Sequence, residues 1–356
     1  MRWKLKPKPD SDQVKSLQNL LNVDELTATL LVQRGIKTFE EARQFFRPKL
    51  EDLHDPYLMK DMDKAIVRIE KAIENQERIL VFGDYDVDGT TAVSLVSSYL
   101  KSYYPNVDTY IPDRYDEGYG ISFKGIDYAE DNEITLIIAL DCGIKSVNHI
   151  AYANAKKIDF IICDHHRPGN SLPDAVAILD PKRQDCDYPY DELCGCGIGF
   201  KLIQALGQNR NETIEDLIPY LDLVATAIGA DIVPITGENR ILAKFGLDVI
   251  NSNPRPGFKA ITQNVKKKEL TITDVVFIIA PRINAAGRIK HGNYAVRLLT
   301  EFGMEEAEAF AKEIETFNAD RKELDKQITV EALSQISTNK EEKRFSTVVY
   351  QEDWHK

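Results

Sequence analysis

The sequence lacks any segment that could cross a membrane or direct secretion. Its longest apolar runs, such as Ile134–Leu140, are far shorter than the roughly 20 residues that a membrane-spanning helix needs. The first residues, Met1-Arg-Trp-Lys-Leu-Lys-Pro, contain no apolar core of a signal peptide. Cysteine is scarce, at five residues in 356, and Cys142 and Cys163 lie in or beside apolar runs, which suits reduced thiols. We therefore expect a cytoplasmic protein that binds no membrane.

Positive charge is also in short supply. The chain has 45 Lys and Arg against 57 Asp and Glu, which gives a formal net charge of −12. Because Lys and Arg make most contacts with phosphate, this balance argues against strong unaided binding of nucleic acid. A metal site built from carboxylates would account for part of the excess, since bound cations neutralise it. The charge of a whole chain also says little about one groove.

Helical and strand-like patterns divide the chain. In residues 1–75, leucines and isoleucines recur at helical spacing. From residue 79, short apolar runs alternate with helical segments, and this alternation predicts right-handed crossovers and a parallel sheet. The apolar runs are Ile79–Phe82, Val107–Ile111, Ile134–Leu140, Phe160–Cys163 and Ala175–Leu179. From about residue 197 the pattern is helical again.

The predicted fold class is α/β, with a parallel sheet flanked by helices, a helical N-terminal segment and a helical C-terminal half. This half ends in a long linker helix over Glu305–Ile336, which is rich in Ala, Glu and Lys and has no Gly or Pro. Phe345–Tyr350 is expected to begin a new strand of a further domain. The predicted units are an N-terminal segment (1–75), a catalytic domain (76–303), a connecting helix (304–337) and the start of a truncated domain (338–356).

Acidic and histidine motifs follow three of the predicted strands. They are Asp84-Tyr-Asp86-Val-Asp88, Asp141-Cys-Gly143 and Asp164-His165-His166. The carboxyl ends of parallel strands meet at one edge of a sheet, so we expect the motifs to converge. Carboxylates with one or two imidazoles suit Mn²⁺ or Mg²⁺. Two such ions about 3.5–4 Å apart are a recurring arrangement for the hydrolysis of phosphate esters.

Each motif taken alone has a simpler interpretation. The Asp-x-Asp-x-Asp run is also compatible with a calcium loop or a solvated turn. A pair of adjacent histidines is often incidental, and Asp-Cys-Gly by itself indicates nothing. The prediction depends on the ordered set at three strand ends, which a random sequence rarely contains.

The same motifs, in this order, resemble the DHH phosphoesterase superfamily, whose name comes from the signature at Asp164-His165-His166. Longer stretches are similar to its single-strand-specific DNA exonucleases, and the resemblance covers nearly the whole chain. These stretches are Gly83-Asp-Tyr-Asp-Val-Asp-Gly, Gly195-Cys-Gly-Ile-Gly-Phe-Lys-Leu, Leu221-Asp-Leu-Val-Ala-Thr-Ala-Ile-Gly-Ala-Asp-Ile-Val-Pro and Pro281-Arg-Ile-Asn-Ala-Ala-Gly-Arg. In this superfamily a DHHA1-like domain follows, and residues 338–356 resemble its beginning.

The resemblance implies a role for each motif residue. Two divalent cations, Mn²⁺ or Mg²⁺, would be held by Asp86, Asp88, Asp141, His165 and Asp231, with Asp141 bridging the two. Asp231 is preferred to Asp222 for the fourth motif, because it follows the apolar run where related phosphoesterases place their ligand. The catalytic set would be Asp84, which orients ligands or water, the bridging Asp141, and His166, which faces the substrate phosphate.

The fifth motif supplies the candidate contacts to substrate phosphate. These are Arg282, Asn284 and Arg288, together with His166. Ala285-Ala286-Gly287 between them lets the backbone approach a ligand, and arginine suits phosphate oxygens better than lysine does. The simpler interpretation is a helix end with solvated arginines.

The resemblance implies a two-metal exonuclease that digests single-stranded DNA from its 5′ end to 5′-mononucleotides, in DNA repair and recombination. It also implies a monomer, with a single-strand-binding protein or a helicase as partner. One alternative is another phosphoesterase of this superfamily, acting on oligoribonucleotides or cyclic dinucleotides. The other is a non-catalytic scaffold that binds DNA, although such a scaffold loses metal ligands and this chain keeps every one.

Overall fold

The computed structural model describes residues 4–289, 291–341 and 343–354, without the side chains of residues 288 and 289. Its centre is one five-stranded sheet in the order β2-β1-β3-β4-β5, and every neighbouring pair is parallel. The strands are β1 (Arg78–Gly83), β2 (Val107–Tyr110), β3 (Ile134–Leu140), β4 (Asp159–Cys163) and β5 (Ala177–Leu179). The predicted α/β fold with its parallel sheet is confirmed.

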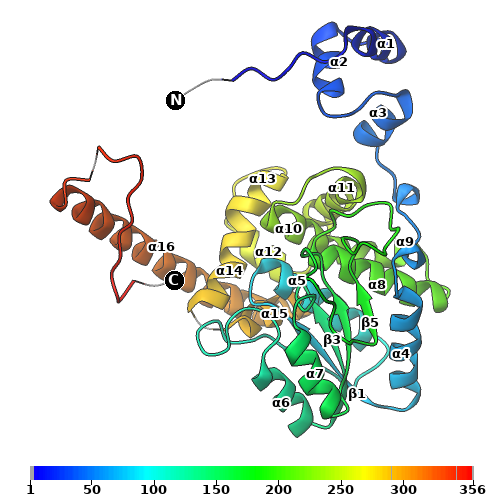
Figure 1. Cartoon of the computed structure of the whole chain (residues 1–356), viewed down its shortest axis with the longest axis vertical. Coiled ribbons are helices and arrows are strands. Elements are labelled where there is room, and N and C mark those ends of the chain that lie inside the picture. The colour runs from blue at the N-terminus through cyan, green and yellow to red at the C-terminus, as the bar shows by residue number, and fades with distance from the viewer. Residues whose placement is uncertain (1–3, 290, 342, 355–356) are drawn as a thin grey trace.

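Alternate strand residues face two separate cores, because side chains along a strand point to opposite sides. In β1, Ile79 and Val81 belong to the larger core, and Leu80 and Phe82 belong to the smaller one. Helices α4 (Met62–Glu74), α5 (Val87–Lys101) and α8 (Gly195–Asn209) cover the larger core. Helices α6 (Phe123–Asp131) and α7 (Val147–Ala155) cover the other face, and Figure 1 shows both layers.

The C-terminal half is helical, as expected. It contains α9 (Ile214–Leu217), α10 (Leu221–Asp231), α11 (Gly237–Ser252), α12 (Pro256–Thr262), α13 (Ile272–Asp274), the π-helix Val275–Ile279, α14 (Ala280–Ile289) and α15 (Asn293–Thr300). The long helix α16 (Met304–Thr338) is continuous over the whole predicted range and projects away from the sheet in Figure 1. None of the described helices is both long enough and apolar enough to span a bilayer.

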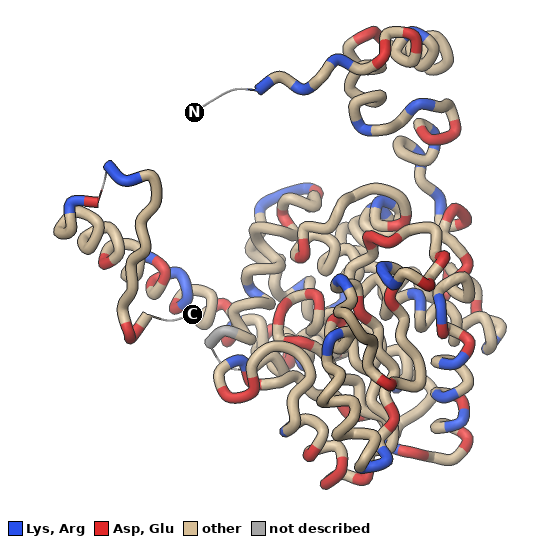
Figure 2. Tube along the Cα trace, viewed as in Figure 1, with Lys and Arg blue, Asp and Glu red and all other residues tan. Residues whose placement is uncertain are grey.

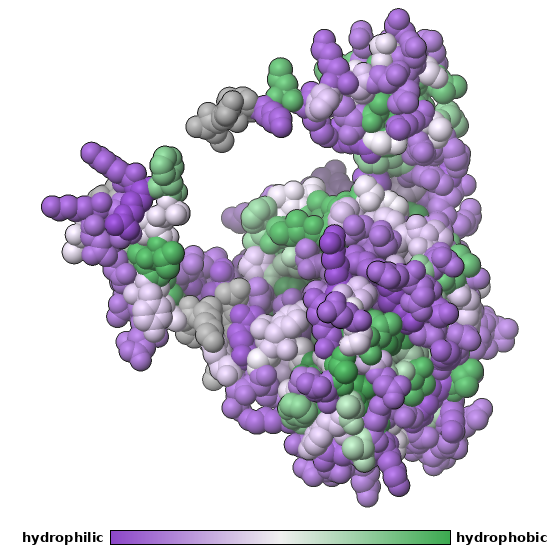
Figure 3. All heavy atoms as spheres, in the orientation of Figure 1, coloured by the Kyte–Doolittle hydropathy of each residue, from purple (hydrophilic) through white to green (hydrophobic). Residues whose placement is uncertain are grey.

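The N-terminal segment forms a small helical unit that stands off from the rest (Figure 1). Its helices are α1 (Ser11–Leu21), α2 (Glu25–Val32) and α3 (Phe39–Phe46), which share a core of their own. This unit is mostly hydrophilic on the face shown in Figure 3. Short 3₁₀ turns at Leu50–Asp52 and Pro56–Leu58 lead from it to α4, and a third lies at Ile218–Tyr220.

One predicted element is wrong. Phe345–Tyr350 forms no strand, and the described residues 343–354 contain only turns and irregular backbone. Phe345 and Val348 are almost fully exposed. A β-propensity pattern forms a strand only when a neighbouring strand accepts and donates the backbone hydrogen bonds, and none pairs with this run.

Candidate metal centre

Four adjacent strands end level with one another, and an aspartate follows each end. The register pairs Gly83 of β1 with Leu140 of β3, Leu140 with Cys163 of β4, and Cys163 with Leu179 of β5. The next residues along the chain are Asp84, Asp141, Asp164 and Asp180. All four are buried. The sheet therefore places its acidic motifs at one edge, as the sequence predicts.

The N-terminus of α8 holds Asp88 in place. Backbone N–H groups of Gly195 and Cys196 each donate to the Asp88 carboxylate over 2.7 Å. This close packing needs glycine at 195, because a Cβ there would lie 2.5 Å from the Asp141 Cβ. Asp86 lies two residues before Asp88 as the N-cap of α5, where its side chain accepts from the Gly89 N–H over 3.0 Å.

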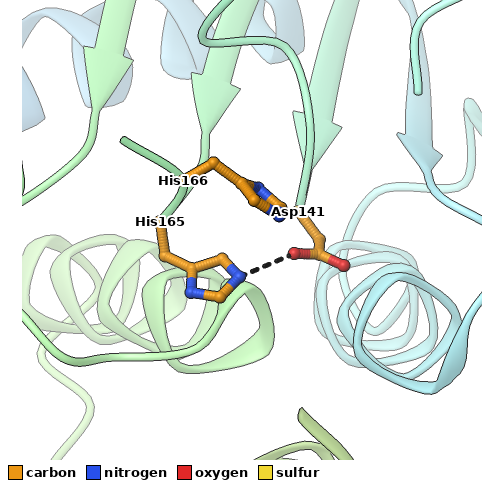
Figure 4. Close-up of side chains that lie close together, drawn as sticks. All are labelled: Asp141, His165 and His166. Carbon is orange, nitrogen blue, oxygen red and sulfur yellow. Dashed lines mark ion pairs between the residues drawn. The ribbon is translucent and has the colours of Figure 1, made fainter. Parts of the chain in front are cut away.

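His165 lies among three carboxylates from different elements. Its Nε2 is 3.1 Å from Asp141 Oδ1, 3.7 Å from Asp231 Oδ2 and 3.8 Å from Asp88 Oδ2. Figure 4 shows the contact between His165 and Asp141, with His166 beside them. The site contains two groups of potential metal ligands, and within each group the ligand atoms lie within 4.8 Å of one another. One group is Asp141 with His165 and His166, and the other is Asp88 with His165 and Asp231. Because both groups contain His165, they form one continuous candidate metal centre.

The carboxyl groups of this centre have strongly raised pKa values. Burial, together with the charges of Asp231 and Asp86, raises the pKa of Asp88 to about 8. Burial and Asp86 raise the pKa of Asp84 to about 7 and that of Asp231 to about 6. The pKa of Asp141 is raised well above its usual value by burial and by Asp88. Such a cluster of carboxylates can ionise together only when a cation compensates their charge.

Several polar atoms of the centre are buried without a hydrogen-bond partner, and they suit a metal ion. They include Asp84 Oδ2 and Asp141 Oδ1. Burial and the neighbouring His166 lower the pKa of His165 to about 4, so the imidazole is neutral at physiological pH and able to ligate a metal. Oxygen donors with one or two imidazoles fit Mn²⁺ or Mg²⁺.

His166 is positioned by Asp164. Its Nδ1 lies 2.7 Å from Asp164 Oδ1, and this hydrogen bond is the main cause of its raised pKa. The same aspartate accepts from the N–H groups of Ile144 and His165. The other ring nitrogen of His166 lies 3.3 Å from the Tyr119 hydroxyl, on the open side of the centre. His166 is therefore a partly exposed imidazole beside the carboxylates, with a pKa above its ordinary value.

The structure distinguishes between the two aspartates of the fourth motif. Asp231 ends α10 and contributes to the centre, as described above. Asp222 is fully buried elsewhere and forms a bidentate ion pair with Arg255, at 2.7 and 2.8 Å. The Arg255 guanidinium thus occupies both Asp222 oxygens.

The fifth motif is only partly directed toward the centre. Arg282 pairs with Glu315 of α16 at 2.6 Å and also donates to the Ile278 carbonyl. Asn284 lines a cavity beside the centre, with its Oδ1 buried and unpartnered. The side chain of Arg288 lies outside the described residues. Phosphate contacts by these three residues stay predictions, and the one by Arg282 requires its guanidinium to leave Glu315.

Sequence reasoning missed two residues of this edge. Asp180 follows β5, is fully buried with Oδ2 unpartnered, and has a pKa raised by burial to about 7. A single Asp after a short strand gives no motif to find. Tyr119 contacts His166 from a loop in which Gly118 and Gly120 both have positive φ. Its Gly-Tyr-Gly sequence is the one signal that could have identified it.

A parallel sheet with buried aspartates at its strand ends and a His-His pair beside them is the architecture of a DHH phosphoesterase. A family model described as the DHH family, N-terminal domain, matches residues 78–228. The RecJ single-stranded-DNA-specific exonuclease of Bacillus subtilis is 41% identical over 338 residues, which is 94% of this chain and 42% of the relative. The Escherichia coli RecJ is 33% identical over 347 residues, or 93% of this chain and 59% of the relative.

Solved structures agree. A crystal structure of exonuclease RecJ bound to manganese superposes with a TM-score of 0.74 at 30% identity, covering 81% of this chain and 72% of the other. The structure of RecJ from Thermus thermophilus in complex with Mn²⁺ superposes with a TM-score of 0.80 at 27% identity, covering 94% of this chain and 48% of the other. The chain therefore belongs to the RecJ family of DHH proteins. It spans about half the length of the curated relatives that it matches.

Proposed function

We propose that this chain is the catalytic core of a metal-dependent exonuclease that degrades single-stranded DNA. The observation that carries this proposal is the cluster of carboxylates around His165 at the sheet edge, with Asp88 and Asp141 buried and Asp231 at its more exposed side, which a bound cation would neutralise. The identity to RecJ exonucleases over nearly the whole chain supports single-stranded DNA as substrate.

Asp86, Asp88, Asp141, His165 and Asp231 would hold two divalent cations, Mn²⁺ or Mg²⁺, with Asp141 between them. When bound, such ions activate a water and stabilise the charge that develops on a phosphate. The remaining residues position the metal ligands and water and polarise the substrate phosphate. His166, whose Nδ1 is held by Asp164, donates a hydrogen bond from its other ring nitrogen to a phosphate oxygen. Asp84, one residue beyond β1, orients ligands or water with its unpartnered Oδ2.

The finer parts of the proposal follow from family membership. Hydrolysis proceeds from the 5′ end and releases 5′-mononucleotides, in DNA repair and recombination in the cytoplasm. The chain is a monomer that works with a single-strand-binding protein or a helicase. Residues 76–303 form the catalytic domain, 304–337 the connecting helix, and 338–356 the start of a DHHA1-like domain.

The test compares substrates under one condition. The chain is loaded with Mn²⁺ and offered single-stranded DNA labelled at the 5′ or the 3′ end, the matching duplex, a short RNA and a cyclic dinucleotide. We expect mononucleotides from the 5′-labelled single strand first, and no hydrolysis after chelation of the metal. Faster turnover of the RNA or the cyclic dinucleotide would assign the chain to another phosphoesterase of the superfamily.

A further inference from the structure

A small cavity opens directly beside the metal centre. Its volume is about 260 Å³, and its walls include Val87 of α5, Ala230 of α10, Pro281 and Asn284 of α14, and Arg321 of α16. Val87 lies between Asp86 and Asp88, and Ala230 precedes Asp231. Pockets that enclose a whole small ligand measure roughly 300–1,000 Å³. This cavity therefore suits a part of a ligand, such as one phosphodiester with its sugar, next to the reacting group.

Arg282, which follows the cavity residue Pro281 on α14, is already neutralised. Its Nε and one terminal nitrogen donate to Glu315 at 2.6 and 3.3 Å, and the other terminal nitrogen donates to the Ile278 carbonyl at 2.8 Å. The two bonds to Glu315 join α14 to α16, which lie side by side in Figure 1. In this arrangement Arg282 links α16 to α14 through an ion pair.

Arg321 differs from Arg282 in every one of these respects. Its Nε is buried in the structure without a hydrogen-bond partner. Its one hydrogen bond among the described residues runs to Asn318 Oδ1 on the same helix, at 3.3 Å, and no described carboxylate forms an ion pair with it. Asn284, across the cavity, also has a buried and unpartnered polar atom. Asn284 and the cation Arg321 thus both line this cavity, and each has one buried polar atom without a partner.

We propose that Arg321 binds a phosphate of the nucleic-acid strand beside the metal centre, with Asn284 as its hydrogen-bonding partner in the same subsite. An arginine presents a planar set of N–H donors that matches phosphate oxygens, and the anion would satisfy the orphaned Nε. The Asn284 amide can rotate to present its NH₂ group as a second donor. This inference deepens the proposed function and rests on it. It makes α16 a contributor to the substrate site as well as a connection.

The experiment measures KM for oligothymidylate hydrolysis with Mn²⁺ at several salt concentrations. Arg321→Gln should raise KM on the order of 10- to 100-fold, because a hydrogen bond to a charged group is lost. The dependence of log KM on log salt concentration should become shallower by about 0.7, the contribution of one single-strand phosphate contact. Hydrolysis of bis-p-nitrophenyl phosphate, which has no neighbouring phosphate, and Mn²⁺ affinity should stay at wild-type values.

Two matched variants separate this subsite from general effects of charge. Lys322→Gln removes an exposed cation from the next position of α16 and should leave KM and the salt dependence unchanged. Asn284→Ala removes a neutral partner, so it should raise KM without changing the salt dependence. If Arg321 had only a structural role, Arg321→Gln would lower the melting temperature but would leave the salt dependence of KM unchanged.

The outcomes are distinct. Arg321→Gln with a wild-type KM and salt dependence overturns the inference, as does an equal loss on the small diester. If Arg321→Gln fails to fold, Arg321→Lys decides: the inference requires a raised KM with an unchanged salt dependence, and a wild-type KM overturns it. A wild-type chain that leaves oligothymidylate intact overturns the proposed function together with this inference.

Discussion

Asp141 has an unusual backbone conformation for a residue with so central a position. Its φ of 60° lies in the left-handed region, which costs most non-glycine residues about 1 kcal/mol but is tolerated by Asp and Asn. Its carboxylate then lies 3.1 Å from His165 and is surrounded by the charges of Asp88 and Asp86. Both the strained backbone and the crowded charges are features that a functional site retains.

This conformation determines which substitution tests the bridging role. Asp141→Asn keeps the tolerated backbone and removes the negative charge, so it should abolish hydrolysis and lose tight binding of both metal ions. Asp141→Ala should do the same and also destabilise the fold by about 1 kcal/mol. Calorimetric titration with Mn²⁺ checks the first effect, and urea unfolding checks the second. Two tight Mn²⁺ ions in Asp141→Asn would show that Asp141 does not bridge them.

The raised carboxyl pKa values make the stability of the metal-free chain depend on pH. Asp84, Asp88 and Asp231 have folded pKa values of about 7, 8 and 6, against an unfolded value near 3.8. Between these limits the folded state binds more protons than the unfolded state. The contribution of these groups to the free energy of unfolding is therefore fully present below about pH 4 and is lost as the pH rises towards 8.

We therefore expect the melting temperature of the metal-free chain to fall from pH 5 to pH 8. Saturating Mn²⁺ should raise it most at pH 8, where the ligands are deprotonated without competition from protons. Asp84→Asn removes one titrating group and should flatten the fall. Scanning calorimetry at four pH values is sufficient. A melting temperature that rises over this range would contradict the raised pKa values.

At the scale of the elements, the parallel sheet and the ends of its strands could be predicted from the sequence for a physical reason. Strands buried on both faces are continuous apolar runs, so β1, β3 and β4 could be located from composition. The polar residue that interrupts each run, as at Asp84 or Asp141, also marks where the strand ends. The long helix over Glu305–Ile336 was predictable because helix-forming residues continue there without interruption.

Contacts between distant elements could not be predicted in this way. Arg282 pairs with Glu315, 33 positions away on another helix, and Asp222 pairs with Arg255, also 33 positions away. Local sequence contains no information about which partner a charged side chain meets. Phe345–Tyr350 shows the same limit for backbone, because its pattern favours a strand but no described strand pairs with it.

The contact between α8 and the end of β3 gives a test at the scale of the elements. Gly195→Ala places a Cβ 2.5 Å from the Asp141 Cβ and 2.8 Å from its Cα, so the start of α8 must move away. That shift weakens the two N–H donors that hold Asp88. We expect a loss of stability of about 1–3 kcal/mol and weaker Mn²⁺ binding.

Gly197→Ala, two residues further along the same helix, is the matched control. Its Cβ would meet only side-chain atoms, the nearest 3.3 Å away on Leu193, which can yield slightly. We expect near wild-type unfolding in urea and unchanged Mn²⁺ titration. Equal effects of the two substitutions would mean that the approach of α8 to Asp141 has no special importance.

For the whole molecule, charge is dispersed and does not form one basic surface along the trace. Acidic and basic residues alternate along most of the tube in Figure 2, including α16. This distribution agrees with the net charge of −12. The proposed phosphate binding would then depend on a few local groups beside the candidate metal centre.

The segment after the N-terminal unit is held to the rest by a buried ion pair. Lys201 of α8 and Glu238 of α11 lie 3.0 Å apart with side chains 0% and 1% exposed. Lys201 also donates to the His54 carbonyl at 2.6 Å, and Glu238 accepts from the His54 N–H at 3.0 Å and from the Tyr188 hydroxyl at 2.7 Å. One pair thus joins the segment before α4 to two helices of the catalytic unit.

Removing one partner of this pair should cost more than removing both. Glu238→Leu leaves the Lys201 ammonium buried without a counter-charge, and we expect a loss of about 3–5 kcal/mol in the free energy of unfolding. Adding Lys201→Met removes the stranded charge, so the double variant should recover part of that loss, although the His54 N–H and carbonyl still lack partners. Urea unfolding of the wild type, Glu238→Leu, Lys201→Met and the double variant gives the coupling energy directly. Additive losses would show that the pair acts as two independent contacts, and the segment at His54 would then be held by its packing rather than by this charge network.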